Sequence, residues 1–401
     1  MPRVRTDAKT CTARSQAGES TTGDLAASAW ADGPDAVWSS VTQAVGSLSG
    51  QRPSLLLLFP DGAFSHQEIV DQARAAAPDV PLAGMTSDGL MTEDGVRLAG
   101  CTAMAFGEEL SVGVGISQHA SSDFRSAGRI AAECAMRHAD PRPGHSLLLM
   151  FLDASSGDQA DAIDGAYSVV GAGVQLAGGG ANGQSVSLLA GDVCCDDAVV
   201  AVSLGSEKPI GIGIGQGCRP LAHLSIATRT NGRTLCELDG RPAEEVYLEG
   251  LNRGGEELSD EEFQALAVLH PLGQPELRGQ LRLRHIHGRA PGGGLACSTP
   301  IPPTAAVWFT EQTTETIVDS AATAVQSALA PLEGDARAVL VFDCAARRHA
   351  LGGALGEEAQ ALLSSFGTVP SLMGLYTRGE VGRSRGAKGD RNHAVVVVAF
   401  G

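Results

Sequence analysis

The chain has 401 residues, of which 43% are hydrophobic and 4% aromatic, and its formal net charge is −17. This length exceeds the roughly 250 to 300 residues at which one hydrophobic core stops growing, so we expect two domains. The negative charge disfavours nucleic acid and anionic membranes as partners, and the aliphatic composition excludes a disordered chain.

The N-terminal segment 1–23 is rich in Thr, Ser and Arg and has no apolar stretch, which predicts a disordered tail and not a secretory signal. No apolar run approaches the roughly 18 residues of a membrane-spanning helix, so no membrane is expected as a partner. The nine cysteines are an odd number without CxxC spacing. They predict reduced thiols, no zinc site and a cytoplasmic location.

Short apolar runs predict strands that are buried on both faces, at 55–59, 147–152, 198–204, 305–309, 338–342 and 394–400. Helices are expected between them. Capping boxes start two helices, at Ser65 and Ser259, because each residue has a Glu three positions later. Apolar spacing predicts further helices over 123–138 and 313–330. The alternation of strands and helices indicates the α/β class.

One β-α-β pattern occurs three times along the chain. In each copy an apolar strand is followed by a helix and by a second strand that ends at a glycine, which is Gly84, Gly178 or Gly374. Leu82 and Leu176 hold equivalent places 94 residues apart, as expected for a duplication. The predicted fold is therefore α/β, with repeated β-α-β units in largely buried mixed sheets covered by helices.

The segment between the second and third copies differs in composition, with more turn and loop signals. Asn231-Gly232 is a hairpin signal, and loops rich in Gly and Pro follow it. The basic stretch 278–289 alternates with apolar residues, which predicts a strand with a solvated face. We place the domain boundary near Val246, with one α/β domain over 24–245 and another over 246–401.

The loops that follow the second strands are candidate ligand sites, because ligands of α/β sheets bind at strand ends. Glycines there allow close approach of a ligand to backbone N–H groups, and hydroxyl or carboxylate side chains can orient a polar ligand. Plain turns remain the alternative interpretation. The candidates are Gly84, Thr86, Ser87 and Asp88 in the first copy, and Gly178, Gly179 and Asn182 in the second.

The third loop has the densest polar cluster beside a buried strand, with Tyr376, Thr377 and Glu380 as candidates. The carboxylate of Glu380 could bind an ammonium group, and the ring of Tyr376 could stack on the same cation. The alternative is that Glu380 pairs with a nearby arginine.

Cys344 and Arg347 follow the strand at 338–342. Arg347 could bind a ligand carboxylate or lower the pKa of the thiol, so Cys344 is either reactive or a packed small residue. Asn392 and His393 stand before the last strand and are expected at the same sheet end. The sequence has no GxSxG, HExxH or P-loop motif, so no metal and no cofactor are expected.

These features together resemble the FIST proteins (F-box and intracellular signal transduction). The loop Gly84 to Gly89, the glycines at 178–180 and Leu238-Asp239-Gly240 match the family pattern, as do Cys344-x-x-Arg347 and Gly374-x-Tyr376-Thr377-x-Gly379-Glu380-Val381. The resemblance implies FIST N and FIST C domains that sense a small ligand, such as an amino acid or a derivative. Met85, in place of the family's usual Cys, is a departure.

Three functional hypotheses follow. The first is an intracellular sensor that binds a small polar ligand at the glycine-rich loops and signals to a downstream protein. The second is an enzyme that attacks a small ester or thioester with Cys344 as nucleophile and His393 as base. The third is an interaction protein without a pocket at the sheet ends. The sensor is the expected function, with all the candidate residues named above as ligand contacts and none of them catalytic.

Overall fold

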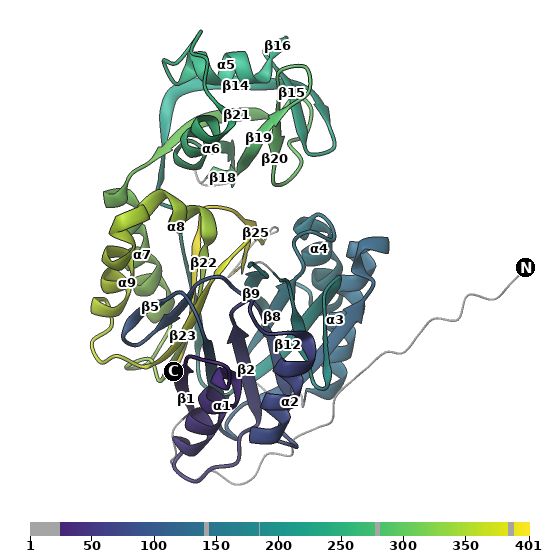
Figure 1. The fold of residues 1–401 in the computed structure, drawn as a ribbon, viewed down its shortest axis with the longest axis vertical. Coiled ribbons are helices and arrows are strands. Elements are labelled where there is room, and N and C mark those ends of the chain that lie inside the picture. The colour runs from purple at the N-terminus through teal and green to yellow at the C-terminus, as the bar shows by residue number, and fades with distance from the viewer. Residues whose placement is uncertain (1–24, 140–143, 184, 277–280, 384–388) are drawn as a thin grey trace, which may run out of the picture.

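The computed structural model describes residues 25–139, 144–183, 185–276, 281–383 and 389–401, and the predicted tail at 1–23 lies outside them. This part of the chain forms a body of three similar units, with a smaller β-rich lobe above it (Figure 1). Helices cover mixed β-sheets throughout the body, so the predicted α/β class with two domains is confirmed.

The first unit sets the pattern for the other two. An outer strand and a helix precede the apolar central strand, which is followed by a helix, a parallel strand, a hairpin and a final antiparallel strand. These elements are β1 (Ala26–Ala31), α1 (Ala36–Gly46), β2 (Leu55–Pro60), α2 (His66–Ala76), β3 (Leu82–Met85), β4 (Leu90–Thr92), β5 (Gly95–Arg97) and β6 (Cys101–Phe106).

The second unit repeats this order, with one short 3-10 helix added. Its elements are β7 (Ser111–Gln118), η1 (Ala120–Ser122), α3 (Phe124–His138), β8 (His145–Leu152), α4 (Gln159–Val170), β9 (Gln175–Gly180), β10 (Leu188–Ala190), β11 (Val193–Cys195) and β12 (Ala198–Ser206).

The third unit is interrupted, because the lobe is inserted between its outer strand and its first helix. The unit consists of β13 (Ile210–Gly215), α7 (Thr314–Leu329), β22 (Ala338–Cys344), α8 (Ala345–Leu351), η3 (Gly352–Ala354), α9 (Leu355–Ser364), β23 (Ser371–Thr377), β24 (Glu380–Arg383), β25 (Asp390–Arg391) and β26 (Val395–Phe400).

The lobe, residues 218–312, has its own apolar core around Tyr247, Phe263 and Phe309. Val246, where we place the domain boundary, lies inside this lobe in α5. The lobe consists of β14 (Cys218–Asn231), β15 (Thr234–Leu238), β16 (Arg241–Pro242), α5 (Ala243–Gly250), α6 (Asp260–Leu269), β17 (Leu272–Pro275), β18 (Leu281–Arg284), β19 (Ile286–Ala290), β20 (Gly294–Cys297) and β21 (Ala306–Gln312).

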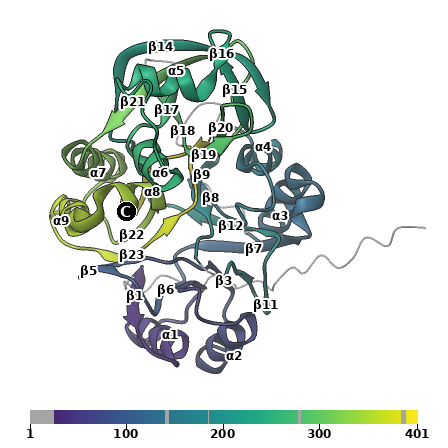
Figure 2. The same cartoon turned by 45° about the horizontal axis from the view of Figure 1, so that its top comes forward.

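The three units exchange their hairpins in a cycle. The hairpin β4–β5 pairs with β23 of the third unit, β10–β11 with β3 of the first, and β24–β25 with β9 of the second. Each unit therefore completes the six-stranded sheet of another unit. In Figure 2 the helices α1 and α2, α3 and α4, and α7 and α9 lie at three corners around these sheets.

Equivalent residues of the central strands meet in the middle of the body. The rings of Phe59, Phe151 and Phe342 are fully buried, and their centroids lie 5.7, 6.2 and 6.3 Å apart pairwise. Ring pairs at these separations stabilise a core beyond their buried area. Since β2, β8 and β22 place matching residues together, their carboxyl ends reach the same end of the body, which faces the lobe.

The strand-end glycines of the first two units stand within strands. Gly84 is opposite Leu58 and Gly178 is opposite Met150 in parallel pairs. A Cβ at these glycines would come within 1.9 Å and 2.0 Å of the carbonyl oxygens of Leu58 and Met150. The glycines therefore let two backbones approach closely, which differs from the expected role of exposing N–H groups to a ligand.

Most locally predicted elements are confirmed. The six apolar runs fall on β2, β8, β12, β21, β22 and β26, and both capping boxes form, at Ser65 and Ser259. The basic stretch 278–289 differs from the predicted single strand with a solvated face, because its described part forms two strands, β18 and β19. Arg284 there is 4% exposed, because its guanidinium pairs with Asp390 of the body at 3.0 Å.

Candidate ligand-binding site

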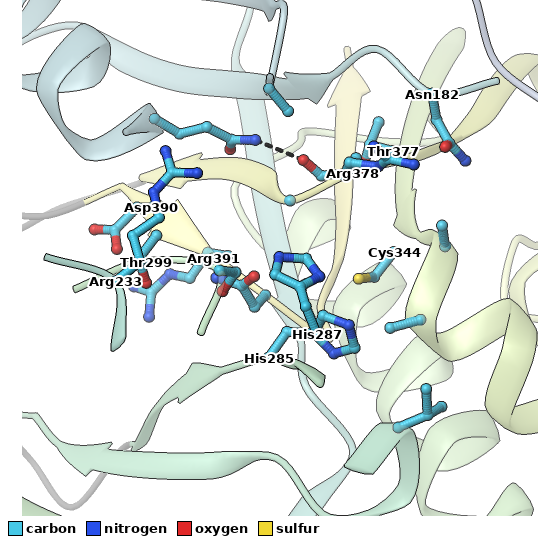
Figure 3. Close-up of a pocket in the computed structure, with 18 of the residues that line it drawn as sticks. Asn182, Arg233, His285, His287, Thr299, Cys344, Thr377, Arg378, Asp390 and Arg391 are labelled. Atoms are coloured by element: carbon cyan, nitrogen blue, oxygen red, sulfur yellow. Dashed lines mark hydrogen bonds between the residues drawn. The ribbon is translucent and has the colours of Figure 1, made fainter. Parts of the chain in front are cut away.

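A pocket of about 300 Å³ lies where the lobe meets the strand ends of the second and third units (Figure 3). This volume is at the lower end of the range for small-molecule sites. The lining residues are Ala154, Gly157, Gln159 and Asn182 of the second unit, Arg233, Val268, His285, His287, Ser298 and Thr299 of the lobe, and Cys344, Ala345, Ala346, His349, Thr377, Arg378, Gly379, Asp390, Arg391 and Asn392 of the third unit.

Two histidines connect the lobe to the third unit beside this pocket. Nδ1 of His285 lies 2.9 Å from Nε2 of His393, and the amide of Gln312 lies 3.2 Å from Nδ1 of His393. Burial lowers the pKa of His285 to about 3, and burial together with His285 lowers the pKa of His393 well below its usual range. Both rings are therefore neutral at pH 7, and both nitrogens of His393 have partners.

Cys344 ends β22 and lies at the wall of the pocket, 4% exposed. Its sulfur accepts the backbone N–H of His393 at 3.3 Å. Burial first, and then the neighbouring Glu380, raise the pKa of this thiol well above its usual range, so Cys344 is protonated at rest. The expected base, the His393 ring, is bonded elsewhere, and this argues against the pairing of Cys344 with His393 as nucleophile and base.

Glu380 is fully buried behind the thiol and does not line the pocket. Its Oε1 accepts the hydroxyl of Thr377 at 3.0 Å, and its Oε2 accepts the N–H of Ala394 at 3.2 Å. Burial raises its pKa to about 8, although hydrogen bonds from Ala394, the Cys344 thiol and Thr377 act in the opposite direction. Glu380 is therefore mostly neutral at pH 7 and poorly suited to bind an ammonium group.

Arg347 is fully buried and satisfied inside the third unit. Its guanidinium bonds Asp343 at 3.0 Å, Ser320 Oγ at 2.9 Å, the Ile317 carbonyl at 3.1 Å and the Glu358 carboxylate. These internal partners leave it outside the pocket lining. The expectation that Arg347 contacts a ligand has no support in this geometry.

Tyr376 is buried next to the same group of charges. Its hydroxyl makes no hydrogen bond to a described residue, and the guanidinium of Arg348 lies 5.6 Å from its ring centroid. The ring therefore already stacks on a cation of the chain itself, and Tyr376 is absent from the residues that line the pocket.

The loop of the first unit that contains Thr86, Ser87 and Asp88 makes contacts with both other units. Thr86 Oγ1 donates to the Ser185 carbonyl at 2.9 Å, and Ser87 Oγ donates to the Tyr376 carbonyl at 2.7 Å. The Asp88 carboxylate pairs with Arg348 at 2.9 Å and accepts the amide of Asn182 at 2.6 Å. Among the described lining residues this loop contributes none, whereas Asn182 does line the pocket.

Gly179 and Asn392 complete the sequence-predicted set. Gly179 pairs with Glu380 across β9 and β24, and a Cβ there would meet Thr377 at 2.7 Å. Asn392 is 6% exposed and lines the pocket. Of the predicted site residues, four line the pocket, namely Asn182, Cys344, Thr377 and Asn392. Three lie directly behind it, namely Gly179, Glu380 and His393. The others lie in the interior or in loop contacts, namely Gly84, Thr86, Ser87, Asp88, Gly178, Arg347 and Tyr376.

Sequence reasoning missed the contributions of the lobe. Arg233 follows the Asn231-Gly232 hairpin turn. His285 lies between β18 and β19 and His287 lies on β19, within the basic stretch for which the sequence predicts a solvated face. Two histidines at alternating positions in a basic strand are the signal that could have identified them. In Figure 3 the Cys344 sulfur points toward the side of the pocket that holds these histidines.

Three lining features point to an anionic ligand. The side chains of Arg233 and Arg378 are exposed at the pocket, and that of Arg378 makes no hydrogen bond or ion pair with a described residue. Gln159 positions Arg378 by donating to its backbone carbonyl at 2.5 Å. The carboxylate of Asp390, which also lines the pocket, is already paired with Arg284.

Within the described residues, no group of three or more His, Cys, Asp and Glu side chains is arranged to hold a metal ion. In the same residues, no helix is long and apolar enough to cross a membrane.

Comparisons with known proteins identify the family. The FIST N domain model matches residues 19–241 and the FIST C domain model matches 243–383. Uncharacterized proteins of Mycobacterium bovis and Mycobacterium tuberculosis are 27% identical over 189 residues, which is 46% of this chain and 48% of theirs, so the chain spans about half the length of the curated relatives it matches.

Among solved structures, a cyanuric acid hydrolase from A. caulinodans is similar with a TM-score of 0.39 and 13% identity, covering 94% of this chain and 98% of that chain. The two family models together span most of the sequence, from the outer strand of the first unit to β24 of the third. The chain therefore belongs to the FIST family, whose N and C domains are sensory domains of signal transduction.

Proposed function

We propose that this protein is a cytoplasmic sensor that binds a small organic acid in the pocket between the lobe and the three-unit body. The pocket itself carries this proposal. Its walls come from both FIST domains, since Gln159, Asn182 and Arg233 belong to the FIST N match and His285 and Cys344 to the FIST C match. A ligand there touches the lobe at Arg233 and His285 and the body at Gln159 and Cys344, so its binding energy can change how the lobe sits on the body.

The charge of the lining selects the ligand class. Arg378 offers a guanidinium to a carboxylate, and His285 and His287 are kept neutral by burial, with Arg378 adding to the effect. The one described carboxylate of the lining, Asp390, is occupied by Arg284. An amino acid can bind through its carboxylate, but a simple amine has no comparable anchor, so we favour organic acids over amines.

Signalling requires that the lobe position be sensitive to the ligand. Two ion pairs join the lobe to β25 beside the pocket. The guanidinium of Arg284 lies 3.0 Å from the carboxylate of Asp390, and the guanidinium of Arg391 lies 3.0 Å from the carboxylate of Glu276. Because Asp390 and Arg391 also line the pocket, an anion bound there competes directly with this cluster. A downstream signalling protein that recognises the lobe position would be the partner.

A thermal-shift screen of amino acids, organic acids and amines tests the proposal. A ligand at about 100 times its Kd adds about 2.7 kcal/mol to the free energy of unfolding, which is a clear rise in Tm. Organic acids should raise Tm in the natural chain and not in Arg378→Gln. Arg219→Gln, an exposed arginine on β14 outside the pocket lining, is the matched control and should keep the shift. If acids act equally on all three proteins, or if amines alone act, the proposed site is refuted.

A further inference from the structure

At one position beside the pocket, the third unit carries a different kind of residue from the first two units. In the parallel strand pairs, Leu58, Met150 and Val341 are equivalent because each is opposite the strand-end glycine of its unit. Three residues further along, the first two units carry aspartates and the third carries a cysteine, the residues being Asp61, Asp153 and Cys344.

The aspartates have a structural role that the cysteine shares. Asp61 accepts the N–H of Gly100 at 2.6 Å, and Asp153 accepts the N–H of Asp197 at 2.9 Å, in both cases at the start of the unit's final strand. Cys344 accepts the N–H of His393 at 3.3 Å in the same place. Sulfur is a weaker acceptor than a carboxylate, so holding this turn does not by itself explain a thiol.

The thiol has a carboxyl partner that is held in position. Glu380 is held beside Cys344 by shared neighbours. Thr377, which is opposite Cys344 in the strand pair, donates to one oxygen of Glu380, and Ala394 donates to the other, next to His393, which donates to the Cys344 sulfur. A nucleophile, a base held next to it and groups that orient the base form the recurring pattern of activated nucleophiles. The pKa of Glu380, about 8, suits proton transfer near neutral pH.

A second feature of the pocket independently indicates a ligand. The hydroxyl oxygen of Thr299 is buried and makes no hydrogen bond to a described residue, although Thr299 is 6% exposed and lines the pocket. The hydroxyl oxygen of the neighbouring Ser298 is also buried and makes no hydrogen bond to a described residue. Buried hydroxyls are normally bonded, so both are suited to meet polar atoms of a ligand.

We propose that Cys344 captures a small carboxylic acid with an adjacent carbonyl, an α-keto acid, as a reversible thiohemiketal, with Glu380 transferring the proton. The inference rests on the proposed function, since Arg378 would hold the carboxylate of the acid. In its ionised form Glu380 takes the proton from the thiol, and Sγ attacks the carbonyl carbon. The S–C bond forms while the C=O π bond breaks, the oxygen takes up a proton from solvent, and Glu380 holds the proton of the thiol. No oxidant or reductant is needed, and the reverse reaction releases the ligand.

The test uses the full chain with pyruvate labelled with carbon-13 at its carbonyl carbon, and lactate as the matched acid without a carbonyl. The natural chain should produce a new tetrahedral signal in the carbon-13 NMR spectrum, distinct from that of the pyruvate hydrate in buffer, and Cys344→Ser should not. Pyruvate at about ten times its dissociation constant should slow alkylation of Cys344 by iodoacetamide about tenfold. Cys236, half-buried on β15 away from the pocket, is the internal control in the same mass spectra.

The variant Glu380→Gln separates proton transfer from packing. It should still form the adduct, but about a hundredfold more slowly, because a positioned base contributes roughly 10² to 10⁴ to such a step. If pyruvate and lactate raise Tm equally and the protein adds no tetrahedral signal beyond that of the hydrate, the thiol adduct is refuted and the sensor survives. If neither acid raises Tm and no adduct forms, the adduct is refuted, and the result also counts against the proposed binding of organic acids.

Discussion

Nδ1 of His285 lies 2.9 Å from Nε2 of His393, and this hydrogen bond joins the inserted lobe to the third unit directly behind the pocket. His393 has a positive φ of 52°, which places its N–H on Cys344 while its ring turns toward the lobe. One residue thus contacts the thiol through its backbone and the lobe through its side chain, so the pocket and the lobe position are physically linked.

Acid should destabilise the protein through these neutral histidines. The pKa of His285 is about 3 in the folded chain and near 6.5 in the unfolded chain, so the unfolded state alone takes up a proton between these values. Stability is therefore greatest above about pH 6.5 and falls as the pH drops toward 3. At pH 5 the loss from His285 is about 2 kcal/mol. Urea unfolding at pH 7.5 and pH 5 measures it, and His285→Gln should show a smaller decline. An unchanged decline in that variant would contradict this explanation.

Glu380→Gln should change the pH dependence in the opposite sense. The pKa of Glu380 is raised to about 8 from 4.5, so the folded state keeps a proton that the unfolded state loses. The stability that Glu380 contributes is complete below about pH 4.5 and is lost as the pH rises through 8. Relative to the natural chain, the glutamine variant should gain about 3 kcal/mol between pH 5 and pH 8. Denaturant midpoints at the two pH values test this, and parallel curves would argue against a buried neutral carboxyl.

Arg347→Met should destabilise the third unit strongly. The substitution leaves the buried Asp343 and Glu358 carboxyls without their cation, and breaking such a buried network costs about 3 to 5 kcal/mol. Arg348→Met is the control, because its pair with Asp88 is partly exposed and contributes about 1 kcal/mol. Chemical unfolding of both variants compares them. Equal costs would mean that Arg347 is not the structural centre we describe.

Gly84→Ala should cost about 3 kcal/mol, because the new methyl group would collide with the Leu58 carbonyl oxygen and the strands would have to separate. Gly46→Ala is the matched control at the end of α1, where a Cβ would meet nothing within 4 Å. That change should stabilise by about 0.5 kcal/mol, since alanine restricts the unfolded chain. Thermal or urea unfolding distinguishes the two, and a neutral Gly84→Ala would show that the strand pair is more tolerant than its spacing indicates.

The sequence was sufficient for features that depend on neighbouring residues. The apolar run at 55–59 becomes β2 because a strand buried on both faces needs continuous apolar side chains. The helix after Ser65 begins as predicted because Ser65 and Glu68 satisfy each other's backbone N–H groups locally. The threefold repeat could also be predicted from the sequence, since duplicated units keep the same order of strand, helix and glycine.

The candidate site could be predicted only in part. Cys344 and Thr377 were recognisable because they end strands of a repeated unit, and strand ends gather at one edge. Arg233 and His285 were not, because they come from an inserted lobe whose docking on the body depends on pairing between residues more than a hundred positions apart, such as His285 with His393.

By itself, the sequence determined the class of fold, the number of repeated units and the segments that form their strands and helices, because these follow from local patterns of apolar and capping residues. The tertiary structure decided which polar residues face a ligand. Arg347 and Glu380 look like ligand contacts in the sequence, but the cyclic exchange of hairpins and the packing of α7 and α9 around them bury both with internal partners. Burial and pairing between distant segments depend on the whole chain, and no local pattern encodes them.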